Sequence, residues 1–437
     1  QGMGHMMQKG SPHTFANMGK KWEWAGWWPV LMAFVLNTYY VAIMSWTLGY
    51  MVHSTTLAWE SEATTHEFFT SFLGVTEGGP GAIGGIQWWV LLGMIICWVA
   101  IFFILHRGVR RVGKGVWVTV LVPWALLIIL VIRGLTLGDA AIEGLNWYLE
   151  PDFNALLDPS VWVAAFGQIA FSLSVGQGIM IAYASYLPKN SDVTNNCFIT
   201  SLADAGTAFF AGFAVFSVLG FMVVQDPSIA TIEEIEGVGT SVGLAFWAYP
   251  QAISALPAGA RFVGIMFFLC LWSLGIDSAF SIAESMITAI RDKWALSKNR
   301  ATALVCSIAL LLGLIYATGA GLHWLDIVDR AVGYYGLLFC GLVMCLIVGW
   351  GFGADRLRTH LNEVSDVKLG RWFNWLIKVV APAAILIPIV PTLIEDIKNP
   401  YGGYPQWALA IGLWGVLIGT LILSFIFAKL KGKEVAK

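Results

Sequence analysis

The sequence predicts an all-helical integral membrane protein that crosses the bilayer about ten times. Of its 437 residues, 58% are hydrophobic and only 12% are charged, whereas a soluble domain carries roughly 25% charged residues. Uninterrupted apolar runs such as 28–52, 86–105 and 407–427 approach or exceed the roughly 20 residues that span a hydrocarbon core. Continuous runs favour helices, because the strands of a membrane barrel alternate apolar and polar side chains.

Ten spans are expected, each bounded by charges, glycine or proline. They cover residues 24–52, 86–106, 116–137, 160–187, 196–225, 261–290, 301–318, 327–352, 372–394 and 406–428. Most of the 25 Lys and Arg residues fall in one set of alternating loops, and the other loops, 60–77, 139–158 and 233–236, are acidic. Short cytoplasmic loops collect Lys and Arg, so both termini are expected in the cytoplasm. The loop 53–85 contains no glycosylation sequence, which favours a prokaryotic inner membrane.

Several functional classes find no support in the composition. The six cysteines show no CxxC spacing, so a disulfide or zinc interpretation is not favoured. A net charge of −2 argues against nucleic acid, and the Lys-rich tail 429–437 is interpreted as a topological anchor. Neither a nucleophile motif nor a nucleotide-binding loop is evident, so no enzyme activity is expected. The chain starts at Gln1 with no signal peptide, which suggests a truncated start.

The fourth span is interrupted at its centre by Ser172-Leu173-Ser174-Val175-Gly176-Gln177-Gly178. Hydroxyls and two glycines at mid-membrane depth favour unwinding. Unwound backbone is tolerated in a bilayer where it lines a cavity, and it supplies free carbonyls for cations and free N–H groups for anions. A binding site is one interpretation. A flexible glycine hinge packed against Ser-rich neighbours is the other.

Two carboxylates lie inside apolar spans, Asp277 in the sixth and Asp204 in the fifth. An intramembrane carboxylate is costly and is treated as a functional candidate. Oxygen ligands suit a hard cation, and Leu274, Asp277 and Ser278 fall within one helical turn, so sodium is the natural partner. The alternative for Asp277 is an ion pair with an Arg elsewhere.

Polar groups at two further positions have two interpretations each. Asp326 and Asp329, next to Arg330 at the outer end of the eighth span, could gate an entrance through a salt bridge or form a solvated helix start. Tyr39 and Tyr40 lie in the middle of the first span, where a hydroxyl needs a partner. That partner is a substrate carboxylate or a neighbouring backbone group.

These residues carry a resemblance to the neurotransmitter:sodium symporter family over nearly the whole chain. Phe171 to Gly178 followed by Tyr183-Ala184-Ser185-Tyr186 resembles the family's broken sixth helix, and the loop Gly144 to Phe153 with Trp162 and Gly167-Gln168 resembles the approach to it. Tyr39-Tyr40 with Ser45-Trp46 is similar to the third helix. The segments Gly243 to Phe246 and Tyr249-Pro250 resemble the loop that caps the outer vestibule.

The resemblance implies an inverted repeat of five plus five helices with two appended helices. On that scheme the first span is helix three, and helix one and most of helix two are absent. Either the chain is truncated, or a separate polypeptide supplies those helices, or transport is lost; truncation is favoured. The implied organisation is a cytoplasmic loop 1–23, the rest of the first repeat 24–137, an outer loop 138–159, the second repeat 160–352, and two appended helices with a tail 353–437.

The functional residues implied by the resemblance fall into three groups. The substrate pocket would be walled by Leu36, Tyr40, Phe171, Ser172, Ser174, Gln177, Ser278 and Ile282. Of the sodium ligands, Leu274, Asp277 and Ser278 would form one site, and Ser172 and Asp204 would form the part of a second site that lies in this chain. The gates would be Asp329 at the outer end, and Asp292 with Tyr186 at the inner end.

The chloride site departs from the family pattern. Gln168 and Ser172 match it, but Ala208 stands where a hydroxyl or carboxylate is needed, and Asp204 stands where Asn is usual. A fixed carboxylate beside sodium compensates its charge without an anion, so chloride-independent coupling is expected.

The expected function is sodium-coupled symport of an amino acid or related small zwitterionic solute by alternating access. Gln177 stands where an aromatic lid residue is common, which favours a smaller or more polar solute side chain. The alternative is a scaffold or receptor-like subunit that keeps the fold without transport.

Overall fold

Helices account for nearly all of the structure, a computed structural model that describes residues 1–106, 109–225, 232, 235 and 241–432. Within these residues, β structure is confined to one isolated bridge between Ile86 and Thr318. The predicted all-helical class is confirmed. The acidic positions 233, 234 and 236 and the basic tail end 433–437 lie outside the described residues.

Eight helical segments of the described chain are long and apolar enough to cross a membrane, or up to nine if one bent pair counts as a span. They match eight of the ten expected spans. Their bounds are Lys20–His53, Trp88–Leu105, Val193–Val224, Ala260–Trp294, Lys298–Ala317, Gly321–Val364, Trp372–Gly403 and Gln406–Lys429.

The other two expected spans, 116–137 and 160–187, are not among these eight segments. The third lies in α6 (Val109–Leu135), a single helix of 27 residues, and a bend of 114° follows it, between Val120–Leu135 and the segment Asp139–Leu157 that begins with α7 (Asp139–Leu149). The fourth is divided into α8 (Pro159–Ser172) and α9 (Ile179–Ala184), and neither piece alone reaches across a bilayer.

The remaining helices fill in the spans and their connections. The α-helices are α1 (Gly2–Met7), α2 (Ser11–Met18), α3 (Glu23–His53), α4 (Thr65–Leu73), α5 (Trp88–Leu105), α10 (Val193–Gln225), α11 (Ser241–Gly243), α12 (Tyr249–Ser254), α13 (Ala260–Trp294), α14 (Lys298–Gly313), α15 (Gly321–Asp329), α16 (Leu337–Leu346), α17 (Ala354–Val364), α18 (Trp372–Trp375), α19 (Ala381–Lys398), α20 (Gln406–Leu409) and α21 (Val416–Lys429). The short 3₁₀ turns are η1 (Lys20–Trp22), η2 (Ala58–Ser61), η3 (Gly79–Gly81), η4 (Asn154–Leu157), η7 (Leu314–Ala317) and η11 (Tyr401–Gly403).

The described residues include five π-helical segments, of which four lie within spans and contact one another in two pairs. They are η6 (Leu244–Ala248), η8 (Arg330–Gly336), η9 (Ile347–Gly353), η10 (Leu376–Val380) and η12 (Ala410–Gly415). Segment η8 packs against η12, and η9 packs against η10. Wide helical turns of this kind are frequent at functional sites, and η8 follows directly after Asp329.

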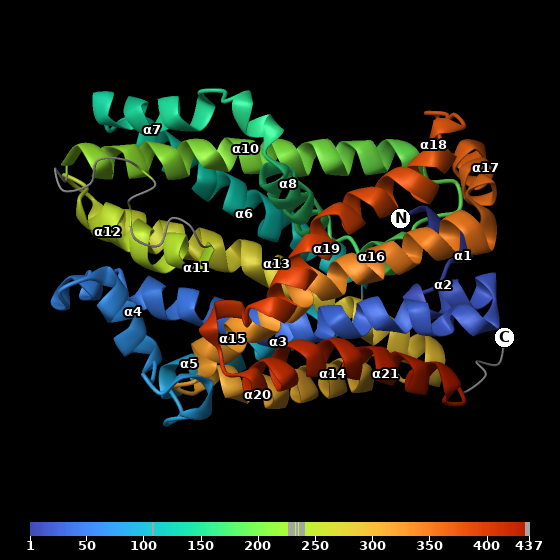
Figure 1. Cartoon of the computed structure of the whole chain (residues 1–437). Helices are drawn as coiled ribbons and strands as arrows, with labels where there is room; N and C mark the ends of the chain where they lie inside the picture. Colours follow the sequence, from blue (N-terminus) through green and yellow to red (C-terminus); the bar gives the residue numbers. More distant parts are fainter. Residues whose placement is uncertain (107–108, 226–231, 233–234, 236–240, 433–437) are drawn as a thin grey trace.

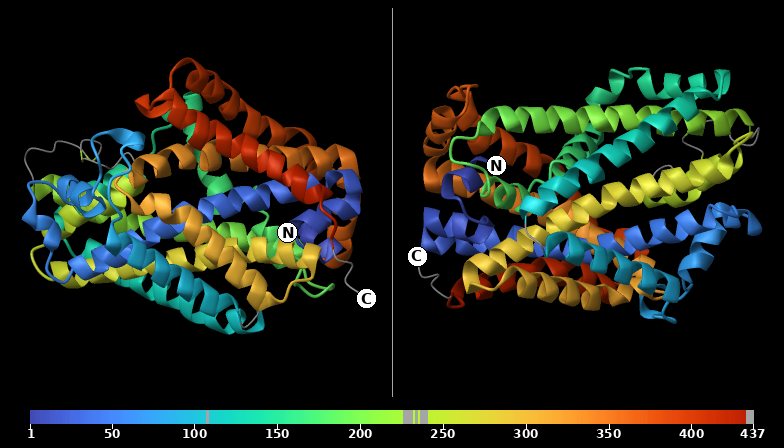
Figure 2. Two further views of the ribbon diagram at one scale, coloured as in Figure 1. Left: turned by 90° about the horizontal axis from the view of Figure 1, so that it is seen from below. Right: turned by 180° about the vertical axis from the view of Figure 1, so that it is seen from behind.

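The long helices run along a common direction, with α3 at the centre of the bundle (Figure 1). Helix α3 packs against α13, α5, α21 and α2. The start of the chain, α2, α17 and the end of α21 lie at one end of the bundle, and α4, α7 and α12 lie at the opposite end (Figure 2). Which side of the membrane this end faces stays a prediction.

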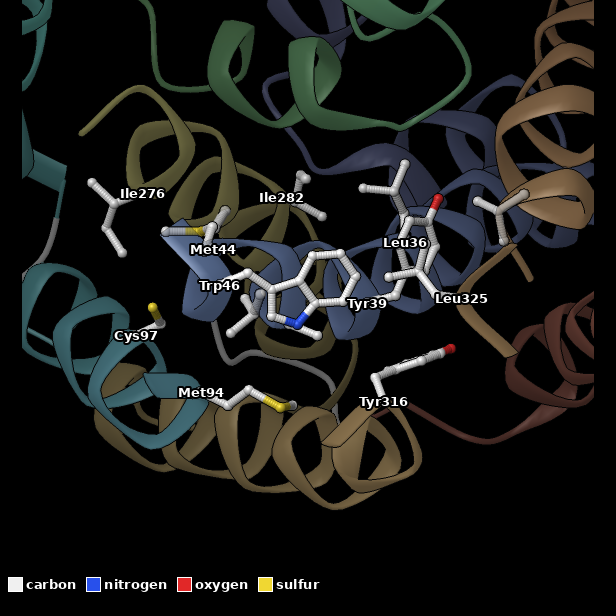
Figure 3. Close-up of a cluster of buried hydrophobic side chains, with 14 of the residues drawn as sticks. Leu36, Tyr39, Met44, Trp46, Met94, Cys97, Ile276, Ile282, Tyr316 and Leu325 are labelled. Carbon is white, nitrogen blue, oxygen red and sulfur yellow. The ribbon is translucent and has the colours of Figure 1, made fainter. Parts of the chain in front are cut away.

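Large apolar side chains of α3 form the centre of the core. Trp27, Trp46 and Tyr50 are fully buried, and a continuous apolar helix surrounded by other helices accounts for this. Figure 3 shows part of the cluster, in which Leu36 and Tyr39 lie near Tyr316 of η7. The Tyr39 and Tyr316 ring centroids are 6.1 Å apart in an edge-on arrangement, which is favourable for aromatic pairs.

Candidate functional site

The predicted break in the fourth span is present. Helix α8 ends at Ser172 and α9 begins at Ile179, with Ser174, Gly176 and Gly178 at φ values of +55°, +74° and +72°. A Cβ atom on Gly176 would lie 2.1 Å from the Leu337 carbonyl oxygen, closer than any side chain permits. Glycine is therefore required here both by its positive φ and by the close approach of α16.

Two of the predicted sodium ligands meet at this break. The Ser172 hydroxyl, on the last residue of α8, donates a 2.6 Å hydrogen bond to the Asp204 carboxylate of α10. Hydroxyl and carboxylate oxygens are ligands of the kind that hard cations prefer. In the last turn of α8 the Ile169, Ala170 and Phe171 carbonyls accept hydrogen bonds from the backbone N–H groups of Leu173, Val175 and Ser174, which close the helix end next to this pair.

The second predicted group of sodium ligands lies on α13, which is continuous from Ala260 to Trp294. Leu274 and Ser278 are exposed, and Asp277 between them is half-buried. The Ser278 hydroxyl is hydrogen-bonded to Tyr40 of α3. The structure therefore joins a predicted substrate residue, Tyr40, to a predicted ion ligand, Ser278.

Two cavities flank the break. The larger, of about 1040 Å³, is lined by Tyr40, Phe171, Gln168 and Asp329 and by residues of η6 and α19. The smaller, of about 540 Å³, is lined by Ser174 and by residues of α1, α9, α10 and α17. Val175, Cys345 and Leu376 line both. The broken segment thus separates a cavity toward α11 and α12 from one toward the end that holds α1 and α17.

The other predicted pocket residues are enclosed by protein. Leu36 and Ile282 belong to the buried core (Figure 3). Gln177 is 3% exposed, and its carbonyl accepts a hydrogen bond from the Ser285 hydroxyl at 3.4 Å. Among the described residues, no group of three or more His, Cys, Asp or Glu side chains is placed to hold a metal ion.

Outer acidic residues take different partners from those considered in the sequence. Asp329 accepts a 2.6 Å hydrogen bond from the Tyr39 hydroxyl. Arg330 does not pair with Asp326 or Asp329, so the salt bridge considered within this segment is wrong. Its guanidinium makes two hydrogen bonds, of 2.9 and 3.0 Å, to Asp396 at the end of α19, because a carboxylate facing it from another helix can accept both.

Asp396 was not singled out in the sequence, nor were the tyrosines around it. Tyr335 donates to Asp396 at 2.6 Å. Asp326 accepts hydrogen bonds of 2.9 Å from both Tyr401 and Tyr404. The sequence does show that Asp396 is a carboxylate at the margin of the ninth span. Its pairing with Arg330, however, depends on how α19 packs near η8.

The expected inner gate residues belong to two separate groupings. Tyr186 contacts Glu284 at 3.0 Å and Thr288 at 2.6 Å. The Asp292 carboxylate instead accepts a 2.8 Å hydrogen bond from the Gly10 backbone. Tyr186 therefore contacts Thr288 and Glu284, which lie one and two turns before Asp292 on α13.

Glu284 is the inner residue that the sequence reasoning missed. It is 2% exposed and forms an ion pair with Lys298 at the start of α14. The signal existed, because Glu284 is a carboxylate inside the sixth span, as Asp277 is. Nearby on α2, burial lowers the pKa of the His13 imidazole, and the neighbouring Asp292 and Glu23 carboxylates oppose that shift.

Comparisons with known proteins identify a family and several relatives. The model of the Sodium:neurotransmitter symporter family matches residues 61–432. An uncharacterized sodium-dependent transporter of Methanocaldococcus jannaschii is 38% identical over 433 residues, covering 98% of this chain and 86% of the relative. The sodium- and chloride-dependent taurine transporter of Rattus norvegicus is 30% identical, covering 91% of this chain and 70% of the relative. The sodium- and chloride-dependent creatine transporter 1 of Bos taurus is 29% identical, covering 96% and 72%.

Proposed function

This chain belongs to the sodium:neurotransmitter symporter family, and from that premise we propose that it carries an amino acid or related small zwitterionic solute across the membrane together with sodium. It is a multi-pass membrane protein and not an enzyme. The observation that supports the proposal most is the hydrogen bond between Ser172, where the broken helix stops, and Asp204.

Sodium would occupy two places in this proposal. One is the Ser172 and Asp204 pair. There a cation would bind the Asp204 carboxylate in place of the hydrogen bond that the Ser172 hydroxyl now donates to it. The other is the group Leu274, Asp277 and Ser278 on α13. Both combine one carboxylate with hydroxyl or carbonyl oxygens, which suits a monovalent hard cation in a poorly hydrated site.

The solute would lie beside the break. Tyr40 and Phe171 line the larger cavity, and Tyr40 shares a hydrogen bond with Ser278. We propose that Tyr40 exchanges Ser278 for the solute carboxylate when the solute binds. Sodium at Ser278 and solute at Tyr40 would then favour the same arrangement, so that each raises the affinity for the other by the same factor.

Alternating access would use the two cavities in turn. Asp329 with Tyr39 would close the outer path, and Tyr186 with Glu284, together with Asp292, would close the inner path. On this proposal, residues 24–137 and 160–352 form the two repeats, and the end that holds α1 and α17 faces the cytoplasm of a prokaryotic inner membrane. The basic residues at that end support this orientation.

The test is sodium-gradient uptake of amino acids by the purified protein in proteoliposomes. Uptake that requires an inward sodium gradient is expected, and the Asp277→Asn variant should lose it. Solute affinity that is the same with and without sodium, measured by calorimetry, would contradict the coupling. Sodium and solute binding without any uptake would favour the scaffold alternative instead.

We propose that transport by this protein does not depend on chloride, unlike transport by the relatives whose names include chloride. Because Asp204 supplies a fixed negative charge beside the proposed ion, uptake should persist when gluconate replaces chloride. The Asp204→Asn variant should gain a chloride requirement or lose uptake. Collapse of wild-type uptake in gluconate would overturn this part of the proposal.

A further inference from the structure

The guanidinium of Arg330 lies directly behind the outer cavity wall. Tyr334 lines the larger cavity, and its ring centroid is 3.9 Å from the Arg330 guanidinium carbon. The ring centroid of Tyr401, in η11, is 4.6 Å from the same carbon. Asp329, the adjacent residue in the chain, lines the same cavity. A positive charge therefore sits next to a carboxylate that lines this cavity.

That positive charge is matched by Asp396 and not by either acid of its own segment. The Arg330 and Asp396 side chains are 13% and 7% exposed, and they make the two-point contact described above. The Tyr335 hydroxyl supplies a further hydrogen bond to Asp396. With Arg330 held in this way, Asp326 keeps its two tyrosine donors and Asp329 keeps Tyr39.

We infer that Asp396 sets the charge of the outer cavity mouth: by neutralising Arg330 it leaves Asp329 as a negatively charged attractor for an entering cation. Asp396 is thus a positioning residue that acts through Arg330. This inference rests on the proposed function, because it concerns the access of sodium. Arg330 is among the charges that act on the Asp329 carboxylate, and neighbouring charges interact appreciably even at the intermediate effective dielectric of a protein surface.

The net charge at this site predicts opposite effects for the two single variants, whereas the loss of a purely structural contact would not. Asp396→Asn makes the mouth one unit more positive, Arg330→Gln makes it one unit more negative, and the double variant returns it to the wild-type value. A clamp that merely ties α19 to η8 would be broken in all three variants. The double variant would then be at least as impaired as either single one.

The experiment measures half-saturating sodium concentration for uptake in proteoliposomes, with choline replacing sodium so that ionic strength stays constant. The sodium requirement should rise about three- to tenfold in Asp396→Asn, fall or stay unchanged in Arg330→Gln, and return to within about twofold of wild type in the double variant. Maximal uptake rates should change much less. Asp396→Glu, which keeps the charge, is the matched control and should resemble wild type.

A double variant that is no better than Asp396→Asn would overturn the inference, as would an unchanged sodium requirement in Asp396→Asn. Wild-type protein without any sodium dependence would instead defeat the proposed function on which the inference rests. Where Asp396→Asn fails to fold, Arg330→Gln alone decides: a sodium requirement raised above wild type contradicts the inference.

Discussion

At the scale of single residues, the inner end of the site depends on Glu284. Its carboxylate contacts Tyr186 and Lys298 while it is almost completely buried. Buried charges are costly unless paired, and removal of one partner leaves the other uncompensated. The Tyr186 and Thr288 hydroxyls also form a hydrogen bond with each other. Glu284 of α13 therefore connects the segment that follows α9 to α14.

Replacing Glu284 with Gln should loosen this inner closure. We expect Cys197, which lines the smaller cavity, to react with a membrane-permeant maleimide roughly tenfold faster, the effect of a shift of about 1.4 kcal/mol. Mass spectrometry of this cysteine measures the rates. The exposed Glu363→Gln on α17 serves as control, and equal labelling of both variants would speak against a closing role for Glu284.

His13 predicts a pH dependence of stability at the same end. Burial lowers its pKa in the folded protein, so on acidification the unfolded chain takes up a proton first, near pH 6.5. Stability associated with His13 is present above that pH and is lost as the pH falls through the folded pKa. The melting temperature should therefore drop more between pH 7.5 and 5.5 in wild type than in His13→Gln. Parallel drops would refute this role.

At the scale of elements, the break between α8 and α9 is specified by glycine conformation and by contact with α16. Gly176 has a φ of +74° and no room for a Cβ beside Leu337. The break is therefore specified by the contact of this segment with α16 as well as by the glycine itself. The five π segments have no comparable local cause that we identify.

Gly176→Ala should destabilise the protein by about 2–5 kcal/mol, the sum of backbone strain and overpacking. Gly419→Ala in α21 is the matched control, because nothing lies within 4 Å of its Cβ position. That change should be neutral or slightly stabilising, since Ala favours helix over Gly. Thermal unfolding in detergent compares the two, and equal melting temperatures would exclude a requirement for glycine at 176.

At the scale of the whole molecule, a buried ion pair joins three long helices. Lys293 of α13 contacts Glu23 of α3 at 2.6 Å and the Ala428 carbonyl of α21 at 3.1 Å. Trp27 donates to the same glutamate at 3.2 Å. Both charged side chains are at most one-tenth exposed, so this contact holds one end of the bundle together.

Glu23→Gln should lower stability by about 3–5 kcal/mol, because it leaves Lys293 buried without its counter-charge. The double variant Glu23→Gln with Lys293→Met should recover a substantial part of the loss. For comparison, Asp355→Asn removes the surface pair with Arg358, in which Asp355 is 67% exposed, and should change the melting temperature little. A Glu23 variant as stable as that control would show that the buried pair is dispensable.

The sequence by itself determined the class of fold, eight of the ten spans, the interruption at 172–178 and the family. Apolar run length, glycine content and intramembrane charge are local properties, and local properties can be read from a chain. The candidate carboxylates Asp204, Asp277 and Asp329 could also be selected this way, because an acid in an apolar span is conspicuous wherever it lies.

Only the tertiary structure decided the partners. Arg330 binds Asp396 and not its neighbours in the chain, and Tyr186 binds Glu284 and not Asp292. Which side chains meet depends on how helices far apart in the sequence pack, and that packing is set jointly by many apolar contacts. No single residue or short motif contains this information, so the fold class was predictable and the pairing of its charges was not.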